Sequence, residues 1–247
     1  LCAAECVLGG LGFVRKADTE VVPGLVGGGV RLVVQDRRQT GGAIDTIGFI
    51  ALLGFFTAHV TGNLVLAGAA LVKGGTGLWV KLGAIPLFIV TVMLAKMWID
   101  RCSQSHKTLG WLFVAEAVFL SAFMLVGLYF DPLLDPGAGE LALTGGLGLM
   151  ALAIRNTASK TLIKHISPST MMTGNTTQFG IDLSNFVRTF SREHGVAVLK
   201  SGSIVVGFVA GAFLGAVLYM RIGFWSVLPF TLAILYLASL AFRKQFI

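Results

Sequence analysis

Residues 201–220 (SGSIVVGFVAGAFLGAVLYM) and residues 222–242 (IGFWSVLPFTLAILYLASLAF) decide the fold of this chain. Neither run contains a charged residue. A helix needs about 20 apolar residues to cross roughly 30 Å of hydrocarbon, and both runs reach that length. Each run therefore predicts a membrane-spanning helix.

Three segments upstream have the same character. Residues 79–99 carry lysines only near their ends, where long side chains can reach the membrane interface. Residues 109–130 are interrupted only by Glu116, and residues 141–163 are apolar until Arg155. Each segment is long enough to cross a bilayer, so we expect three more spans.

Two shorter uncharged runs, 46–58 and 60–72, lie on either side of His59. Each has about 13 residues, which is too short to span alone. The motif Thr61-Gly62-Asn63 follows His59. Glycine breaks helices, and threonine and asparagine are good helix N-caps. The pattern predicts a span that ends near Phe56 and a short helix that begins at the motif.

The composition also indicates a membrane protein. Only 13% of the residues are charged and the mean hydropathy is +0.83, whereas a soluble domain carries about 25% charged residues. The net charge of +7 indicates basic loops on the cytoplasmic side, so we expect the lipid bilayer and not nucleic acid as partner. The three cysteines and four histidines are too scattered for a disulfide framework or a zinc site. We expect no metal and no cofactor.

The N-terminal segment, residues 1–40, does not fit this pattern. It carries nine charged residues and two short apolar runs, neither of which is long enough to span. A span that ends near Phe56 should start near residue 35, where a cluster of charges lies. We therefore expect residues 1–40 not to be native to the domain, with an amphipathic leader as the alternative. The membrane domain is expected to cover residues 41–247.

The Thr-Gly-Asn motif has a second copy at Thr173-Gly174-Asn175, in the C-terminal half of the chain. Each copy follows a predicted span that contains polar residues about 16 to 18 positions before the motif. Each copy also precedes a pair of predicted spans. Those upstream residues are Asp45 in the first copy and Arg155 with Asn156 in the second. The pattern predicts two related halves, about 41–130 and 141–247.

Loop charges predict how the halves are oriented. Basic residues put the 96–107 loop, the loop after residue 160 and the C-terminus on the cytoplasmic side, and acidic residues put the 131–140 loop outside. If the second motif helix, within 170–187, does not cross, each half has three crossings and the repeats are inverted. If the motif helices cross, the repeats are parallel. We favour the inverted arrangement, an all-α integral membrane protein of about six spans plus two short motif helices.

The two motif helices indicate a binding site. The first turn of a helix has unpaired N–H groups and a partial positive charge, so two such starts near a shared midplane could hold a small polar or anionic solute. The second motif helix also predicts a polar face, which either lines a cavity or lies in the interfacial water. The structural alternative is that the motifs only cap broken helices. The predicted substrate-binding residues are Thr61, Gly62, Asn63, Thr173, Gly174, Asn175, Gln178 and Asp182.

Charged and titratable residues inside the predicted spans form a second group of candidates, because charges in lipid are unfavourable unless paired or hydrated. Asp45 and Arg155 occupy similar places in the two halves, so we expect a salt bridge between them. Alternatively, Arg155 reaches the cytoplasmic surface. His59 could relay protons or simply be hydrogen-bonded at a helix end, and Glu116 could couple protons or reach the headgroups. The predicted gating or proton-coupling residues are Asp45, His59, Glu116, Arg155 and Asn156.

Three stretches carry a family resemblance: GGAIDTIGF (41–49), FFTAHVTGNLVLAGAALV (55–72) and PSTMMTGNTTQFGIDL (168–183). Together they resemble the YoaK family of bacterial membrane proteins, whose function is unknown, and the likeness covers about residues 41–245. Arg155-Asn156 stands where the family has a Gln-Asn pair, and Gln35 to Thr40 stand where it has the apolar start of the first span. The resemblance implies a multi-pass protein of the bacterial inner membrane.

The favoured function is a small-solute transporter or permease with its site between the two motif helices. The alternative is a non-transporting membrane module that binds a lipid or a partner protein. A membrane-embedded enzyme is the least favoured, because the sequence shows no pair of carboxylates and no set of metal ligands at a spacing typical of a catalytic site. We therefore expect no enzymatic activity.

Overall fold

The computed structural model describes residues 28–102, 105–162 and 171–243, and the regular structure of these residues is entirely helical. This finding confirms the all-α prediction. In chain order the elements are α1 (Gly28–Ala51), α2 (Val60–Lys73), α3 (Leu78–Arg101), α4 (Ser105–Phe130), α5 (Gly139–Thr161), α6 (Met172–Thr189), α7 (Arg192–Ile222), the short 3-10 helix η1 (Gly223–Val227) and α8 (Leu228–Phe242).

Four helical stretches of the described residues are long and apolar enough to cross a membrane. They are α3, α4 from His106 onward, α5, and the stretch from Arg192 to Phe242, in which η1 separates α7 from α8. These helices lie where apolar runs predicted spans, namely at 79–99, 109–130, 141–163, 201–220 and 222–242.

The start of α7 lies well before its apolar run because polar residues stabilise it there. The Ser191 hydroxyl accepts a hydrogen bond from the His194 N–H at 3.3 Å, and Glu193 lies in the first turn. A hydroxyl N-cap and an acidic first turn both favour a helix start. The resulting helix has 31 residues and is roughly 46 Å long, longer than the hydrocarbon core is thick.

The break between α1 and α2 occurs earlier than expected. The helix α1 ends at Ala51 rather than near Phe56, because Leu53 and Gly54 take positive φ values of 51° and 88°, which a helix cannot contain. The same helix begins at Gly28, so it includes part of the segment that we assigned to the N-terminal region. Residues 1–27 lie outside the described part of the chain.

The Thr-Gly-Asn motifs lie in the first turns of α2 and α6 but do not cap them. The N-cap residues are His59 and Met171, and neither helix start has a side-chain cap hydrogen bond. The expectation that threonine and asparagine cap these helices was therefore wrong. In the first copy the asparagine bonds to the preceding loop instead.

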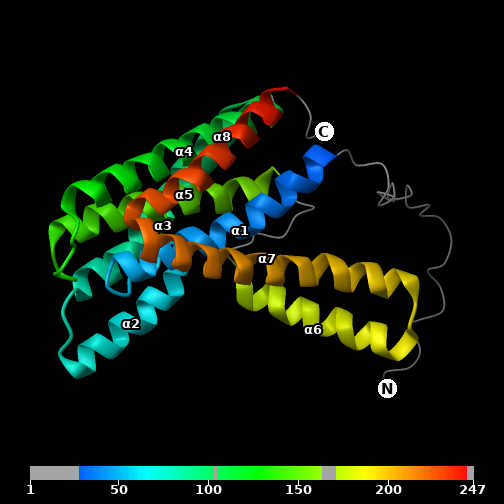
Figure 1. The fold of residues 1–247 in the computed structure, drawn as a ribbon, viewed down its shortest axis with the longest axis horizontal. Coiled ribbons are helices and arrows are strands. Elements are labelled where there is room, and N and C mark those ends of the chain that lie inside the picture. Colours follow the sequence, from blue (N-terminus) through cyan, green and yellow to red (C-terminus); the bar gives the residue numbers. More distant parts are fainter. Residues whose placement is uncertain (1–27, 103–104, 163–170, 244–247) are drawn as a thin grey trace, which may run out of the picture.

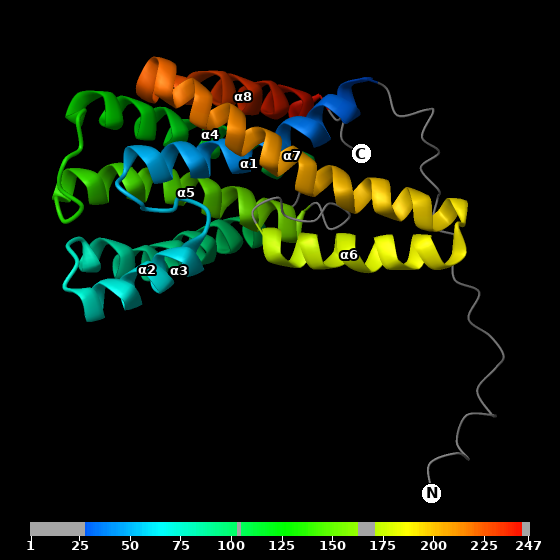
Figure 2. The ribbon, with the colours of Figure 1, turned by 60° about the horizontal axis from the view of Figure 1, so that its bottom comes forward.

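The helices pack as a set of neighbouring pairs (Figure 1). The first helix, α1, runs along α7, α6 packs on α7, and α2 packs on α3, while α4 packs on both α5 and α8. In Figures 1 and 2, α2 and α6 both start near the middle of the molecule and run outward in opposite directions. This arrangement brings the two motifs towards each other.

Glycines allow α1 and α7 to approach closely. A Cβ atom on Gly42 would meet the carbonyl oxygen of Phe208, and one on Gly211 would meet that of Gln39. Side chains at either position would push the two backbones apart. Such contacts through small residues are typical of helix pairs in membranes.

Candidate functional site

A cavity of about 610 Å³ lies between the starts of α2 and α6. This volume is within the usual range of small-molecule sites, about 300–1,000 Å³. The helices α3 and α5 provide further walls. The lining residues are Ala58 to Thr61 before and at the start of α2, Phe88, Val92 and Lys96 of α3, Asn156, Thr157, Lys160 and Thr161 of α5, and Met171 to Gly174 at the start of α6.

Five of the predicted functional residues line this cavity: His59, Thr61, Asn156, Thr173 and Gly174. They come from three segments of the chain, namely the start of α2, the second half of α5 and the first turn of α6. The sequence had assigned them to two separate roles, solute binding and proton coupling. The fold brings both groups to one place.

The cavity carries positive charge. Its described lining includes two lysines and no acidic residue. Lys96 forms an ion pair with Asp100, one turn further along α3, on an exposed face, where such pairs contribute little. Lys160 is exposed and makes no ion pair among the described residues. Most of the remaining lining is apolar, so the cavity can hold a small anion with a hydrocarbon part.

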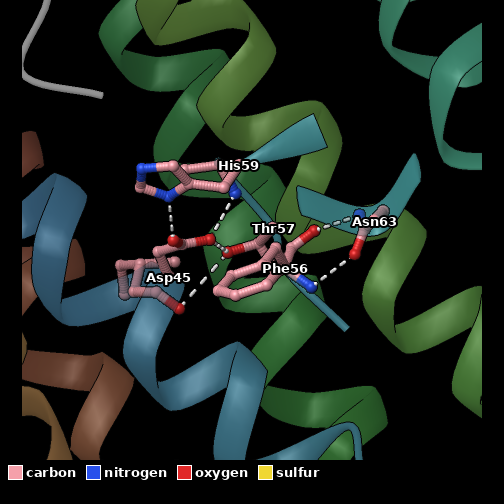
Figure 3. Close-up of polar contacts among 7 residues, drawn as sticks. Asp45, Phe56, Thr57, His59 and Asn63 are labelled. Atoms are coloured by element: carbon pink, nitrogen blue, oxygen red, sulfur yellow. Dashed lines mark hydrogen bonds and ion pairs between the residues drawn. The ribbon is translucent and has the colours of Figure 1, made fainter. Parts of the chain in front are cut away.

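Asp45 organises the chain between α1 and α2 (Figure 3). One carboxylate oxygen accepts from the Ala58 N–H at 2.6 Å and from the Thr57 hydroxyl at 3.4 Å. The other lies 2.5 Å from Nδ1 of His59. Asp45 is buried, with 4% of its surface exposed, and a buried charge requires such partners. Its contacts fix His59 at the wall of the cavity.

Asn63 closes the same loop from the other side (Figure 3). Its side-chain oxygen accepts from the Phe56 N–H and its side-chain nitrogen donates to the Phe56 carbonyl, both at 2.8 Å. The side chain thus satisfies two main-chain groups that have left the helix. Asn63 therefore stabilises the loop through the Phe56 main chain and does not itself line the cavity.

The predicted salt bridge between Asp45 and Arg155 was wrong, because the carboxylate of Asp45 and the guanidinium of Arg155 each bond to another side chain. Asp45 pairs with His59. The guanidinium of Arg155 donates to Oε1 of Glu116 through two nitrogens, and both side chains are buried. This pair joins α5 to α4. Arg155 therefore does not extend to the surface, as the alternative interpretation had it.

The polar face of α6 is only partly enclosed. Asn175 is buried, with 6% of its surface exposed, whereas Gln178 is exposed and donates to Asp182 at 2.8 Å. Neither Gln178 nor Asp182 lines the cavity. The side of α6 that packs on α7 instead presents Phe179, which would meet a Cβ atom placed on Gly202.

Sequence reasoning did not identify the two lysines of the cavity. A signal existed for Lys160, which lies one helical turn after Asn156 and therefore on the same side of α5. Lys96 gave no such signal, because the sequence does not reveal that α3 and α5 are neighbours. The third missed residue is Thr57, which bonds Asp45.

Comparison with known proteins identifies the family. DUF1275, described as a protein of unknown function, matches residues 39–240. The chain is also 31% identical to the UPF0700 transmembrane protein YoaK of Bacillus subtilis (strain 168) over 188 residues, which are 72% of this chain and 78% of that protein. No solved structure matches. The chain is a multi-pass membrane protein that belongs to the DUF1275 family and is related to YoaK.

Proposed function

We propose that this protein is a permease for a small organic anion, which binds between the starts of α2 and α6. One observation carries the proposal: two helix starts from opposite halves of the sequence line a single cavity. The first turn of each helix has N–H groups without intrahelical partners and a partial positive charge. Together with Lys96 and Lys160, these turns favour an anion over a cation.

The apolar part of the lining narrows the class of solute. Phe88 and Val92 of α3 face the cavity together with Met171 and Met172 at the start of α6. A sugar or an inorganic ion would leave these side chains without a suitable partner. A carboxylate or phosphate ester with a hydrocarbon body would contact both the apolar wall and the positive groups.

We further propose that the two halves form an inverted repeat. The starts of α2 and α6 lie at Val60 and Met172, and the ends of α4 and α8 lie at Phe130 and Phe242. The separation along the sequence is the same in both pairs, and it equals the separation of the two motifs. The packing of α2 on α3 corresponds to that of α6 on α7. The opposite directions of α2 and α6 in Figure 2 support an inverted and not a parallel repeat. In this proposal α1, α3 and α4 correspond to α5, α7 and α8, and these six helices cross the membrane.

An inverted repeat supplies a mechanism of transport. The cavity separates part of α3 from α5. In the proposed repeat α3 corresponds to α7 and α5 to α1, and α7 and α1 are held together at Gly42 and Gly211. In the alternative state, α3 and α5 would pack closely and the cavity between them would close, while α1 and α7 would move apart and open a cavity there. The same binding site then faces the other side of the membrane.

The pair of Asp45 and His59 is suited to couple this movement to protons. When His59 is neutral, the carboxylate of Asp45 keeps its negative charge near the bound anion. A proton on His59 compensates that charge, so proton binding and anion binding favour each other. Glu116 and Arg155 form an ion pair with each other, and in this proposal their role is to hold α4 against α5.

A second candidate function is a non-transporting module that binds a lipid or a partner protein. The exposed Gln178 and its partner Asp182 on α6 favour it, because a polar surface outside the cavity can contact headgroups or another protein. The two candidates differ in whether a soluble ligand occupies the cavity.

A thermal-shift screen on detergent-purified protein tests the proposal. The panel contains small carboxylates, phosphate esters, inorganic anions, sugars and amino acids. The test variant, Lys96→Gln with Lys160→Gln, removes both charges of the cavity. The matched control, Lys73→Gln with Lys81→Gln, removes two lysines that do not line it. A specific ligand stabilises the folded state by mass action.

We expect an organic anion to raise the melting temperature of the wild type and of the matched control, but not of the cavity variant. Uptake of that anion into proteoliposomes then tests transport directly. A binding anion that is not taken up would favour the second candidate function. Stabilisation by uncharged solutes alone, or equal stabilisation of the cavity variant, would contradict the proposed site.

A further inference from the structure

A second hollow lies on the other side of α3, away from the solute cavity. The helices α3 and α4 each pack along α5, and between them lies a groove of about 370 Å³. Its wall is almost entirely apolar, and the hydroxyl of Thr91, which also lines it, donates to the Leu87 carbonyl at 2.8 Å. Apart from the indole N–H groups of Trp98 and Trp111 at one end, the remaining lining side chains are apolar. Its chemistry matches a hydrocarbon chain.

Two tryptophans mark one end of this groove. Trp98 lies near the end of α3 and Trp111 near the start of α4, and both belong to its lining. Each of the two residues is exposed, at 38% and 55% of its surface. Tryptophan is enriched at the level of the lipid headgroups. The tryptophan end of the groove is therefore expected to lie at the membrane interface, with the remainder of the groove in the hydrocarbon.

Basic side chains stand at the same end. Arg101 lies three residues after Trp98, and Lys107 lies four residues before Trp111. Residues three or four apart share one side of a helix, so each base extends from the side of its helix that carries a groove tryptophan. Both bases are exposed, and among the described residues neither forms an ion pair. The charge at this end complements an anionic headgroup.

We propose that the groove between α3 and α4 binds one anionic phospholipid. One acyl chain lies in the apolar groove between Thr91 and Phe119, and the tryptophans flank the glycerol region. The phosphate contacts Arg101 and Lys107. This site is separate from the solute cavity, so it holds whether or not the protein is a permease.

Native mass spectrometry tests this site on the full-length protein. The purified protein is equilibrated in mild detergent with equal amounts of phosphatidylglycerol and phosphatidylcholine that carry the same acyl chains. We expect one phosphatidylglycerol to be retained per chain, in preference to phosphatidylcholine by about tenfold. Arg101→Gln with Lys107→Gln should abolish the preference. Equal retention of both lipids by the wild type would overturn the proposal.

A pair of phenylalanine substitutions on α4 tests the groove itself. Ala115 lines the groove, so Ala115→Phe should fill it and release the bound lipid. Val118 is 59% exposed and does not line it, so Val118→Phe should retain the lipid and controls for added bulk. Retention by Ala115→Phe at the wild-type level would rule out the groove as the site. A change of oligomeric state with unchanged lipid retention would do the same, and would assign the groove to contact between copies of the chain.

Discussion

Asn63 holds both main-chain groups of Phe56 across the break between α1 and α2, as donor and as acceptor, at 2.8 Å each. A peptide strand would make the same pair of bonds in a sheet, but here one side chain provides them. The loop that carries Thr57, Ala58 and His59 lies between these two residues in the sequence. The asparagine of the first motif therefore fixes the segment from which His59 reaches the cavity.

Asn63→Ala should therefore destabilise the protein substantially. It leaves the N–H and the carbonyl of Phe56 without their partner, and each unsatisfied buried group costs about 1–3 kcal/mol. We expect a clearly lower melting temperature in detergent. Asn185→Ala is the matched control, because that half-buried side chain lies at the far end of α6, and it should melt within a few degrees of the wild type. Equal melting temperatures of Asn63→Ala and wild type would contradict the role of this bond pair.

The glycines of the two motifs should differ in their response to alanine. A Cβ atom on Gly62 would lie 2.9 Å from the Phe56 ring, whereas one on Gly174 would meet nothing within 4 Å. Neither glycine has a positive φ, and alanine favours helix by up to about 1 kcal/mol over glycine. Gly62→Ala should destabilise by about 1–3 kcal/mol, and Gly174→Ala should be neutral or stabilising. Thermal unfolding in detergent measures the stability of both variants. A lower melting temperature for Gly174→Ala than for Gly62→Ala would show that the Phe56 ring moves aside freely.

The long helices were predictable from uncharged runs. A helix that crosses a bilayer must be long and apolar, and a single stretch of sequence shows both properties. The sequence also predicted a break before the first motif, but the chain leaves α1 at Leu53 and Gly54, whereas the motif glycine lies inside α2. The site was predictable only in its location, between the two motifs. Its partners were not, because helical periodicity shows which residues share one helix face but not which helices are neighbours. Asp45 was accordingly assigned to Arg155 by position in the repeat, whereas it bonds His59, only 14 residues away.

The pair of Glu116 and Arg155 should tolerate joint replacement better than the loss of one partner. Both side chains are nearly inaccessible, at 1% and 3%, so a single Glu116→Gln leaves a buried guanidinium charge. Removal of one member of a buried pair costs about 3–5 kcal/mol, while apolar replacement of both is often nearly neutral. Glu116→Met with Arg155→Met should therefore melt at a higher temperature than Glu116→Gln. If the double variant is the less stable of the two, Arg155 has a further essential contact.

A double-mutant cycle should detect direct coupling between Asp45 and His59. Asp45→Asn and His59→Gln each replace one member of the hydrogen-bonded pair, and the second change should cost less once the first is present. We expect a coupling energy of about 1–3 kcal/mol, from melting or from denaturant unfolding in detergent. Asp45→Asn with Arg155→Gln is the control cycle and should be additive, because these residues have separate partners. Additivity in the first cycle would show that the hydrogen bond contributes little.

The proposed inverted repeat predicts that α2 and α6 end on opposite sides of the membrane. Lys73 lies at the end of α2 and Arg188 in the last turn of α6, and both are exposed. After replacement of the native cysteines, Lys73→Cys and Arg188→Cys can be labelled in intact bacteria and in inverted vesicles with an impermeant thiol reagent. Because basic residues lie at the ends of α3, α6 and α8, we expect these helix ends on the cytoplasmic side. Residue 188 should then react from inside and residue 73 from outside. Reaction of both cysteines from one side would exclude the inverted arrangement and, with it, the proposed exchange between the α3–α5 and α1–α7 sides.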